Sequence, residues 1–436
     1  MIIALVLFLL TYVLLLAFAK YRAYIALAAA TIFILMTYLP INEWLTGGSH
    51  IDYMPLDQIF GAIEWNVILM IFGTMGVVAL FIESKMPALM ADWIIEKAPN
   101  ITVAILWLSV LAGLISAFVD NVATVLMVAP VALTISKKLK VNPVPSLIAI
   151  AIASNLQGAG TLVGDTTSIM LGAQANMDFF DFFFFQGKVS LFFIVQLGFL
   201  VATLVLYALL PKQKEKPSID QKTVVTDFFP SFLMVGVVVF LIAASFIPGK
   251  PEVTNGLICV GLMVVGIVRK MVKVPKTNVV KDTLKEVDFF TLFLLCGLFI
   301  VIKSLENAGV ITAIGDFISQ IAGNNLFAAY SIIVWTSVLI SAFVDNIPYV
   351  ATMLPVTAII ASNMGIQPEL LYFGLLIGAT LGGNLTPIGA SANITAIGIL
   401  RKDGYEVKTW DFMRLGIPYT LSAVTVGYLL VWFLWR

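Results

Sequence analysis

A six-residue sequence that occurs twice is the feature that most constrains this chain. Residues 116–121 and residues 341–346 both read Ser-Ala-Phe-Val-Asp-Asn. Each copy places one carboxylate, Asp120 or Asp345, inside a long apolar stretch. A charged side chain inside a membrane is costly and usually has a function there. Two identical charged sequences, 225 positions apart (345 minus 120), predict one site that is built from two halves.

The composition is that of an integral membrane protein. Of the 436 residues, 60% are hydrophobic and 11% are charged, whereas a soluble domain usually carries about 25% charge. We therefore predict an all-α polytopic protein in the lipid bilayer. Lys plus Arg and Asp plus Glu number 25 each, and without a basic stripe we expect no nucleic-acid partner. The single histidine, His50, has no second ligand nearby and makes a poor metal site.

Apolar runs of about 20 residues predict membrane-spanning helices. Eight runs are plain spans: 2–19, 23–41, 63–84, 189–210, 231–247, 253–268, 288–305 and 412–435. Segments 101–136 and 326–362 are too long for one helix, and the repeated sequence interrupts each of them. Segments 144–177 and 369–400 have a polar, Gly-rich middle and predict broken helices. Amphipathic stretches 86–97 and 308–321 are predicted to lie along the membrane interface.

The positions of Lys and Arg test this arrangement of spans. If 101–136 and 326–362 each return to the side they entered, while 144–177 and 369–400 each cross once, the chain makes ten crossings. Both termini then lie outside, and only four Lys and Arg residues lie outside with them: Lys188, Lys250, Lys303 and Arg436. This bias agrees with the excess of basic residues in cytoplasmic loops. It does not separate a re-entrant hairpin from two full crossings. We expect residence in the plasma (inner) membrane.

Matches at a fixed offset extend well beyond the repeated sequence. Ser116 matches Ser341, Thr161 matches Thr386, and further pairs are Pro130 with Pro355, Gly158 with Gly383 and Gly164 with Gly389. Because each half makes an odd number of crossings, the second half is inverted, a pattern typical of alternating-access transporters. We predict two repeats joined by a cytoplasmic linker, 211–228. The first repeat, 1–210, contains scaffold helices 1–97, a transport region 101–177 and a closing helix 189–210. The second repeat, 229–436, contains scaffold helices 229–321, a transport region 326–400 and a closing helix 412–435.

Polar residues at the interruptions are the candidate site. Irregular backbone at membrane depth is tolerated where it lines a cavity or is buried in protein, and a broken helix frees carbonyl and N–H groups. The candidate substrate or ion ligands are Asp120, Asn121, Asp345, Asn346, Asp165, Thr161, Thr166, Thr167, Ser168, Asn384, Thr386, Ser391 and Asn393. The supporting residues are Ser116, Ser341, Asn155, Gly158, Gly164, Gly383 and Gly389. Small residues such as these also serve ordinary helix packing in membranes.

Oxygen ligands without basic neighbours favour a cation. Segments 144–177, 326–362 and 369–400 contain no Lys, Arg or His, so we expect the core carboxylates to face no cationic side chain. Na⁺ is a hard cation that takes oxygen ligands, and Asp120, Asp165 and Asp345 are its candidate anchors. Asp165 has no mate in the repeat, because Ala390 stands there. We expect no cofactor beyond Na⁺ or H⁺ as the transported or coupling ion.

The main hypothesis is a secondary transporter, most simply a Na⁺/H⁺ antiporter. The alternative is Na⁺- or H⁺-coupled transport of an oxyanion or organic acid such as a dicarboxylate, citrate or arsenite, because helix N-termini bind anions without arginine. An intramembrane aspartyl protease would also use paired Asp residues. Asp165, however, follows Leu162-Val163-Gly164 rather than a Gly-x-Gly sequence. A channel is a further alternative, and saturable, counter-ion-dependent flux would distinguish a transporter from it.

These motifs resemble the ion transporter superfamily, in the branch of arsenite pumps, NhaD-type sodium/proton antiporters and P protein, with its citrate-transporter-like domain. The similarity rests on the repeated sequence, on Thr-Leu-Val-Gly-Asp at 161–165, and on Gly-Gly-Asn-Leu-Thr-Pro-Ile-Gly-Ala-Ser-Ala-Asn at 382–393. It implies a homodimer with a scaffold, a moving transport region and hairpin tips that carry Asp120 and Asp345. The first broken helix reads Gly-Asp-Thr-Thr-Ser at 164–168, where many members have Gly-Asp-Pro-Pro-Asn. That departure leans toward cation or proton handling.

Overall fold

The computed structural model describes residues 1–39, 51–217, 222–225, 227–273, 278–323 and 325–436. His50 lies outside these residues. The described chain is helical except for one small antiparallel hairpin, in which β1 (Phe184–Phe185) pairs with β2 (Lys188–Val189). The prediction of an all-helical membrane protein with several apolar spans is confirmed, apart from this hairpin.

The helix bounds follow the predicted segments closely. The first half contains α1 Ile2–Ala17, α2 Arg22–Tyr38, α4 Ile59–Ala62, α5 Trp65–Glu83, α6 Met86–Lys97, α7 Ile101–Ser116, α8 Asn121–Lys138, α9 Val144–Gly158, α10 Thr166–Ala175 and α11 Leu191–Leu209. The second half contains α12 Phe229–Ser245, α13 Thr254–Lys273, α14 Val279–Lys285, α15 Phe289–Asn307, α16 Val310–Ala322, α17 Leu326–Ser341, α18 Asn346–Asn363, α19 Glu369–Gly382, α20 Ser391–Lys402 and α21 Thr409–Trp435. Single 3₁₀ turns are η1 Ala19–Tyr21, η2 Leu56–Gln58, η3 Phe180–Phe182 and η4 Gly383–Leu385.

The helices differ in whether they are long enough to cross a bilayer. Among the described helices, five are long and apolar enough to cross alone: α5, α11, α13, α15 and α21. Helices α1 and α2 are apolar but only 16 and 17 residues long. At 1.5 Å per residue each reaches about 25 Å, which is less than the hydrocarbon thickness of about 30 Å. The turn between α1 and α2, which ends at Arg22, therefore need not lie in water.

Local sequence explains where the interrupted segments turn. Asn100 accepts a hydrogen bond from the backbone N–H of Val103 (2.9 Å) and caps α7. Asn325 accepts one from Ala328 (3.1 Å) and caps α17. Each of these helices ends inside the repeated sequence, and the next helix begins at Asn121 or Asn346. Such side-chain caps replace the partners that the first N–H groups of a helix lack.

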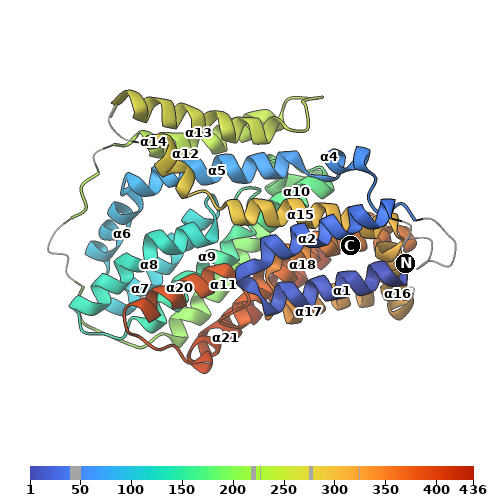
Figure 1. The fold of residues 1–436 in the computed structure, drawn as a ribbon. Helices are drawn as coiled ribbons and strands as arrows, with labels where there is room; N and C mark the ends of the chain where they lie inside the picture. Colours follow the sequence, from blue (N-terminus) through green and yellow to red (C-terminus); the bar gives the residue numbers. More distant parts are fainter. Residues whose placement is uncertain (40–50, 218–221, 226, 274–277, 324) are drawn as a thin grey trace.

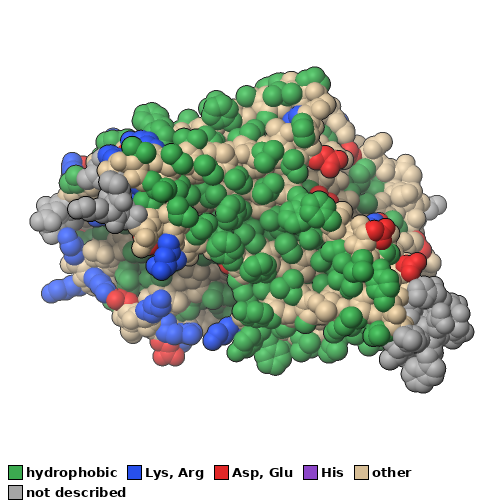
Figure 2. Space-filling model, turned by 45° about the horizontal axis from the view of Figure 1, so that its top comes forward, with side chains coloured by type: hydrophobic (Ala, Val, Ile, Leu, Met, Phe, Trp, Pro, Cys, Tyr) green, Lys and Arg blue, Asp and Glu red, His purple; other side chains and the backbone are tan. Residues whose placement is uncertain are grey.

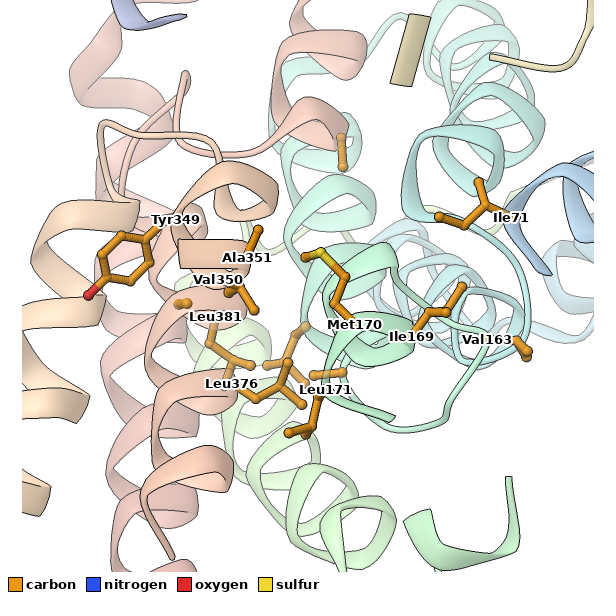
Figure 3. Packing of buried hydrophobic residues seen from close by; sticks show 14 of the residues in the cluster. Ile71, Val163, Ile169, Met170, Leu171, Tyr349, Val350, Ala351, Leu376 and Leu381 are labelled. Carbon is orange, nitrogen blue, oxygen red and sulfur yellow. The ribbon is translucent and has the colours of Figure 1, made fainter. Parts of the chain in front are cut away.

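The core brings elements from distant parts of the chain side by side. Helix α2 packs along α15, α5 along α13, α7 along α9, and α17 along α19. The short helix α10 lies between α18, α19 and α5. Figure 3 shows Ile169 and Val163 on the side of Ile71 from α5, whereas Met170 and Leu171 lie toward Leu376 and Leu381 of α19. The first half of the chain is thus packed into the second around α10.

Charge is unevenly distributed along the molecule. Both termini lie at the same end of the fold (Figure 1). Lys and Arg side chains gather at the opposite end in Figure 2, and apolar side chains cover much of the surface between the ends. The described part of the linker 211–228 is bound to the body: the Thr102 hydroxyl donates to the Pro211 carbonyl (2.7 Å), and the Thr223 N–H donates to Asp92 (2.7 Å).

Candidate functional site

The two hairpin tips have nearly the same construction. The Asp120 carboxylate caps α8 by accepting from the backbone N–H groups of Val122 (3.0 Å) and Ala123 (3.2 Å). The Asp345 carboxylate caps α18 by accepting from Ile347 (3.1 Å). The carboxylates that look costly in the sequence therefore each meet a helix N-terminus, where a negative charge is favoured.

Each hairpin tip is tied to the neighbouring helix break. The Thr161 hydroxyl donates to the Ala117 carbonyl, and the Thr386 hydroxyl donates to the Ala342 carbonyl at the equivalent place. Within each break the same pattern repeats: the Ser168 hydroxyl donates to Gly158 (3.3 Å), and the Asn393 amide donates to the carbonyls of Gly383 (3.0 Å) and Thr386 (3.1 Å). Four predicted ligands, Thr161, Thr386, Ser168 and Asn393, therefore donate to the backbone and shape the breaks.

Two glycines allow the tips and breaks to meet. A Cβ on Gly164 would lie 2.6 Å from the Gly158 carbonyl oxygen and 2.9 Å from those of Ser116 and Ala117. A Cβ on Gly389 would meet the three equivalent carbonyl oxygens of Gly383, Ser341 and Ala342 at 2.6, 2.7 and 2.8 Å. No side chain fits at either position, because real Cβ atoms do not approach backbone oxygens so closely. Each glycine thus brings three carbonyl oxygens around one point.

Asp165 connects the two halves. Its Oδ2 accepts from the Thr167 hydroxyl (2.7 Å) and from the Asn346 amide (3.3 Å). The Thr167 hydroxyl also lies 2.9 Å from the hydroxyl of Thr380 on α19. The carboxylate without a mate in the repeat is therefore held from both halves.

A second chain of amides lies beside it. The Asn121 amide donates to Asn155 Oδ1 (2.9 Å), and the Asn155 amide donates to the Thr380 carbonyl (2.8 Å) and to Asn384 Oδ1 (3.1 Å). The Asn384 amide in turn donates to the Ile152 carbonyl (2.9 Å). Asn121 Oδ1 is buried and has no hydrogen-bond partner in the described structure, so an oxygen acceptor is left available beside Asp120.

The supporting serines are used within the helix pairs. The hydroxyls of Ser154 and Ser116 lie 3.0 Å apart, and Ser154 also donates to the Asn121 carbonyl (3.1 Å). The Ser341 hydroxyl donates to the Ala379 carbonyl (2.5 Å). Ser116 and Ser341 therefore each connect a hairpin helix to the first arm of a broken helix, which is a structural role.

A cavity of about 250 Å³ collects seven of the predicted polar residues. Its polar lining from the predicted set consists of Asp120, Asn121, Asn155, Asp165, Thr166, Asn346 and Ser391. The exposed side chains Glu286 and Asp288 belong to the same cavity, and Asp288 also caps α15. No Lys, Arg or His is found among the described residues that line it. The cavity is thus acidic from its exposed mouth to its buried Asp165.

Asp345 departs from the expectation that core carboxylates face no cationic side chain. Arg22 Nη1 lies 2.8 Å from Asp345 Oδ2, with side-chain exposures of 14% and 5%. The guanidinium also donates from Nε to the Leu15 carbonyl (3.1 Å). Arg22 is not one of the four Lys and Arg residues predicted outside, so it was expected in an inside loop. The turn between α1 and α2 instead carries it to the second hairpin tip, so the prediction is wrong for Asp345.

The described structure contains no group of three or more His, Cys, Asp and Glu side chains that could hold a metal ion. Asp120, Asp165 and Asp345 thus do not form one compact cluster. Any cation bound beside Asp120 and Asp165 would need amide, hydroxyl and carbonyl oxygens as its other ligands, and these are the oxygens that surround the two residues.

Sequence reasoning missed four residues of the site. Thr380 was detectable, because it stands at the repeat offset from Asn155. Asp288 begins the apolar run 288–305, where an acid ordinarily serves the start of a helix, and Glu286 lies two positions before it. Arg22 gave no local signal, since its partner is 323 positions away.

A family model described as "Citrate transporter" (CitMHS) matches residues 6–378. The chain belongs to this family. It is accordingly a secondary transporter of this family and not an enzyme. The resemblance predicted from the motifs is confirmed.

Relatives in this family span most of the chain. The 46 kDa membrane protein of Mycobacterium leprae is 31% identical over 401 residues, which cover 89% of this chain and 92% of that protein. An uncharacterized transporter of Mycobacterium tuberculosis (strain CDC 1551 / Oshkosh) is 31% identical over 86% of this chain and 89% of its own length. Human P protein is 25% identical over 87% of this chain, a match that spans 55% of that longer protein.

Two solved transporter structures share the fold. The YdaH transporter of Alcanivorax borkumensis superposes with a TM-score of 0.59 at 12% identity, covering 94% of this chain and 96% of that one. MtrF of Neisseria gonorrhoeae superposes with a TM-score of 0.56 at 15% identity, covering 95% and 94%.

Proposed function

We propose that this citrate-transporter-family protein binds a cation at the Asp120–Asp165 cavity and works by alternating access as a Na⁺/H⁺ antiporter. The observation that carries the proposal is the acidic lining of the cavity. Two buried or half-buried carboxylates and two exposed ones line it, with no basic side chain among its described residues. A buried carboxylate without a cationic side chain requires a proton or a metal cation to offset its charge.

The ligands suit Na⁺ in chemical type. Asp120 and Asp165 supply carboxylate oxygens, Asn121 Oδ1 has no partner, and Thr166 and Asn155 line the same cavity. A hard cation with oxygen ligands fits such a set. Protonation of Asp165 would remove one ligand charge, so H⁺ and Na⁺ would compete for the same residues.

The decisive measurement is Na⁺-dependent proton flux in proteoliposomes. Asp120→Asn and Asp165→Asn are each expected to abolish the flux, because each removes one charge from the cation ligands while the side-chain shape is retained. Glu306→Gln is the matched control, since Glu306 is exposed and pairs with Lys303 three positions away (2.9 Å). Wild-type flux in either Asp variant, with the control unaffected, would refute the proposal.

A second candidate is Na⁺- or H⁺-coupled transport of an organic acid or oxyanion, such as a dicarboxylate, citrate or arsenite. The family description favours citrate, and the N-termini of α10 and α20 place Thr166 and Ser391 in the cavity lining. Helix N-termini bind carboxylates well. Uptake of radiolabelled citrate driven by a Na⁺ or pH gradient would favour this function, and it would require cations to enter with the anion.

We further propose that the two halves form an inverted repeat of five crossings each, with re-entrant hairpins α7–α8 and α17–α18 and broken helices α9–α10 and α19–α20. The equivalent tip and break contacts in the two halves support this arrangement. The domain boundaries remain those given from the sequence: scaffold helices within 1–97 and 229–321, and transport regions 101–177 and 326–400. A homodimer completes the proposal, and its mass in a detergent-corrected light-scattering experiment would test it.

A further inference from the structure

The second hairpin tip contains a cationic side chain of the protein itself. Arg22 pairs with Asp345 at 2.8 Å, and both side chains are largely buried. The Ser391 hydroxyl donates to the same carboxylate oxygen, Asp345 Oδ2 (3.1 Å). The pocket at this tip is lined by Tyr12, Leu15, Leu16, Arg22, Val344, Asp345 and Pro348 and leaves no volume for a further water-sized particle. The guanidinium thus fills the space beside the carboxylate.

The first hairpin tip lacks such a group. Among the described residues Asp120 has no ion-pair partner, and it lines the acidic cavity. The two tips share their sequence, their helix-capping role and their ties to the helix breaks. They differ in what offsets the carboxylate charge. At equivalent positions, the protein supplies a positive charge to Asp345, whereas its described residues supply none to Asp120.

We propose that Arg22 is a tethered cation that occupies the ion position of the second hairpin tip, so that the exchangeable cation binds only beside Asp120 and Asp165. The inference rests on the proposed function for the first tip alone; the role of Arg22 at the second tip stands on its own contacts. Arg22 then determines the binding stoichiometry, because its presence sets how many ions the chain binds.

The position of Arg22 is itself fixed by neighbouring contacts. Its Nε donates to the Leu15 carbonyl at the end of α1 (3.1 Å). The Tyr12 hydroxyl donates to the Pro348 carbonyl and lies 2.6 Å from the Thr352 hydroxyl, which joins α1 to the first turns of α18. The α1–α2 turn thus presents the guanidinium to Asp345 from a supported frame.

Thermal unfolding of the purified protein tests the role of Arg22 without any transport assay. Arg22→Ala in choline chloride should lower the Tm by at least about 5 °C, because a buried carboxylate loses its partner. Replacing choline with Na⁺ at equal ionic strength should recover half or more of that loss. Because the site beside Asp120 and Asp165 is intact in every variant, the Na⁺ effect is measured relative to that of the wild type. Arg22→Ala/Asp345→Asn should gain no more Tm from Na⁺ than the wild type does, and Arg22→Lys should retain most of the wild-type Tm.

Arg269→Ala is the matched control. Arg269 pairs with Asp227 (2.7 Å) outside the site, and both side chains are about one-third exposed (37% and 28%). This variant should lose stability and gain no more Tm from Na⁺ than the wild type does. The role of Arg22 would be overturned if Na⁺ raised the Tm of Arg22→Ala no more than that of the wild type, or if Arg22→Ala were as stable as the wild type in choline.

Binding of radioactive ²²Na⁺ at equilibrium tests the number of sites. Wild-type protein should bind one Na⁺ per chain, Arg22→Ala two, and Arg22→Ala/Asp345→Asn one again. Two ions bound by the wild type would overturn the inference. No binding by the wild type, combined with Na⁺-specific recovery of Arg22→Ala, would instead refute Na⁺ as the ion of the proposed function and leave the tethered cation supported.

Discussion

Asp120 and Asp345 show how far an identical sequence can diverge in environment. Both residues cap a helix at a hairpin tip. Asp120 lines the acidic cavity, whereas Asp345 meets Arg22. The repeat was sufficient to predict that both carboxylates lie at corresponding places. It could not predict the partner of Asp345, because that partner comes from a part of the chain that the offset match does not include.

The close carbonyl contacts of Gly389 lead to a prediction at this scale. Gly389→Ala should abolish transport and reduce the yield of folded protein, because its Cβ would lie 2.6–2.8 Å from three backbone oxygens. Gly398→Ala on α20 is the control: no atom lies within 4 Å of a Cβ there, and alanine is the better helix former. Size-exclusion profiles and flux would be compared, and a fully active Gly389→Ala protein would contradict the packing argument.

Individual elements were predictable to within a few residues. The predicted broken segment 144–177 contains α9 and α10, and the amphipathic stretch 86–97 coincides with α6. Apolar runs, prolines and glycines mark these boundaries locally, so no knowledge of tertiary contacts was needed. Which helices are neighbours was not predictable, because α2 and α15 or α5 and α13 are paired by three-dimensional packing alone.

The crossing of α9 and α19 depends on one buried amide. Asn155 contacts Asn121, the Thr380 carbonyl and Asn384. Asn155→Ala would leave these buried groups without partners, at a cost of about 1–3 kcal/mol. We expect a clearly lower Tm than for Asn363→Ala, which removes exposed contacts to Asp316 and Ser319. Equal melting temperatures of the two variants would show that Asn155 does not stabilise the crossing.

The end of α13 is joined to the start of α12 by a pH-sensitive ion pair. Arg269 donates to the Asp227 carboxylate at 2.7 and 3.2 Å and lowers the pKa of Asp227 to about 2. Because the folded pKa is below the ordinary value, the pair stabilises the protein above about pH 4, and this contribution is lost as the pH falls through 2. Asp227→Asn should therefore reduce the free energy of unfolding at pH 7 by less than about 1 kcal/mol. The Tm should fall slightly as a result.

The check is the difference in Tm between wild type and Asp227→Asn across pH. That difference should be constant from pH 5 to 8 and shrink as the pH falls from about 4 toward 2. A difference that stays the same over the acidic range would contradict the assigned cause.

At the scale of the whole molecule, the placement of charge predicts orientation. Lys and Arg gather at the end away from both termini, which predicts that this end is cytoplasmic. In a Cys259→Ala/Cys296→Ala background, a membrane-impermeant maleimide should label Glu252→Cys in intact cells and leave Lys214→Cys unlabelled until the cells are opened. The reverse pattern would invert the proposed topology. Both test positions are exposed.

Arg22 also has a consequence for how the protein is made. The ribosome delivers Arg22 more than 300 residues before Asp345. Throughout that interval the newly inserted arginine lacks its native counter-charge. An unpaired guanidinium is held near the lipid headgroups rather than deep in hydrocarbon. The pair of helices α1 and α2 is therefore expected to lie shallowly in the membrane during synthesis. It would reach its final depth only after the second copy of the repeated sequence is inserted, so that formation of this ion pair is a late step of membrane assembly.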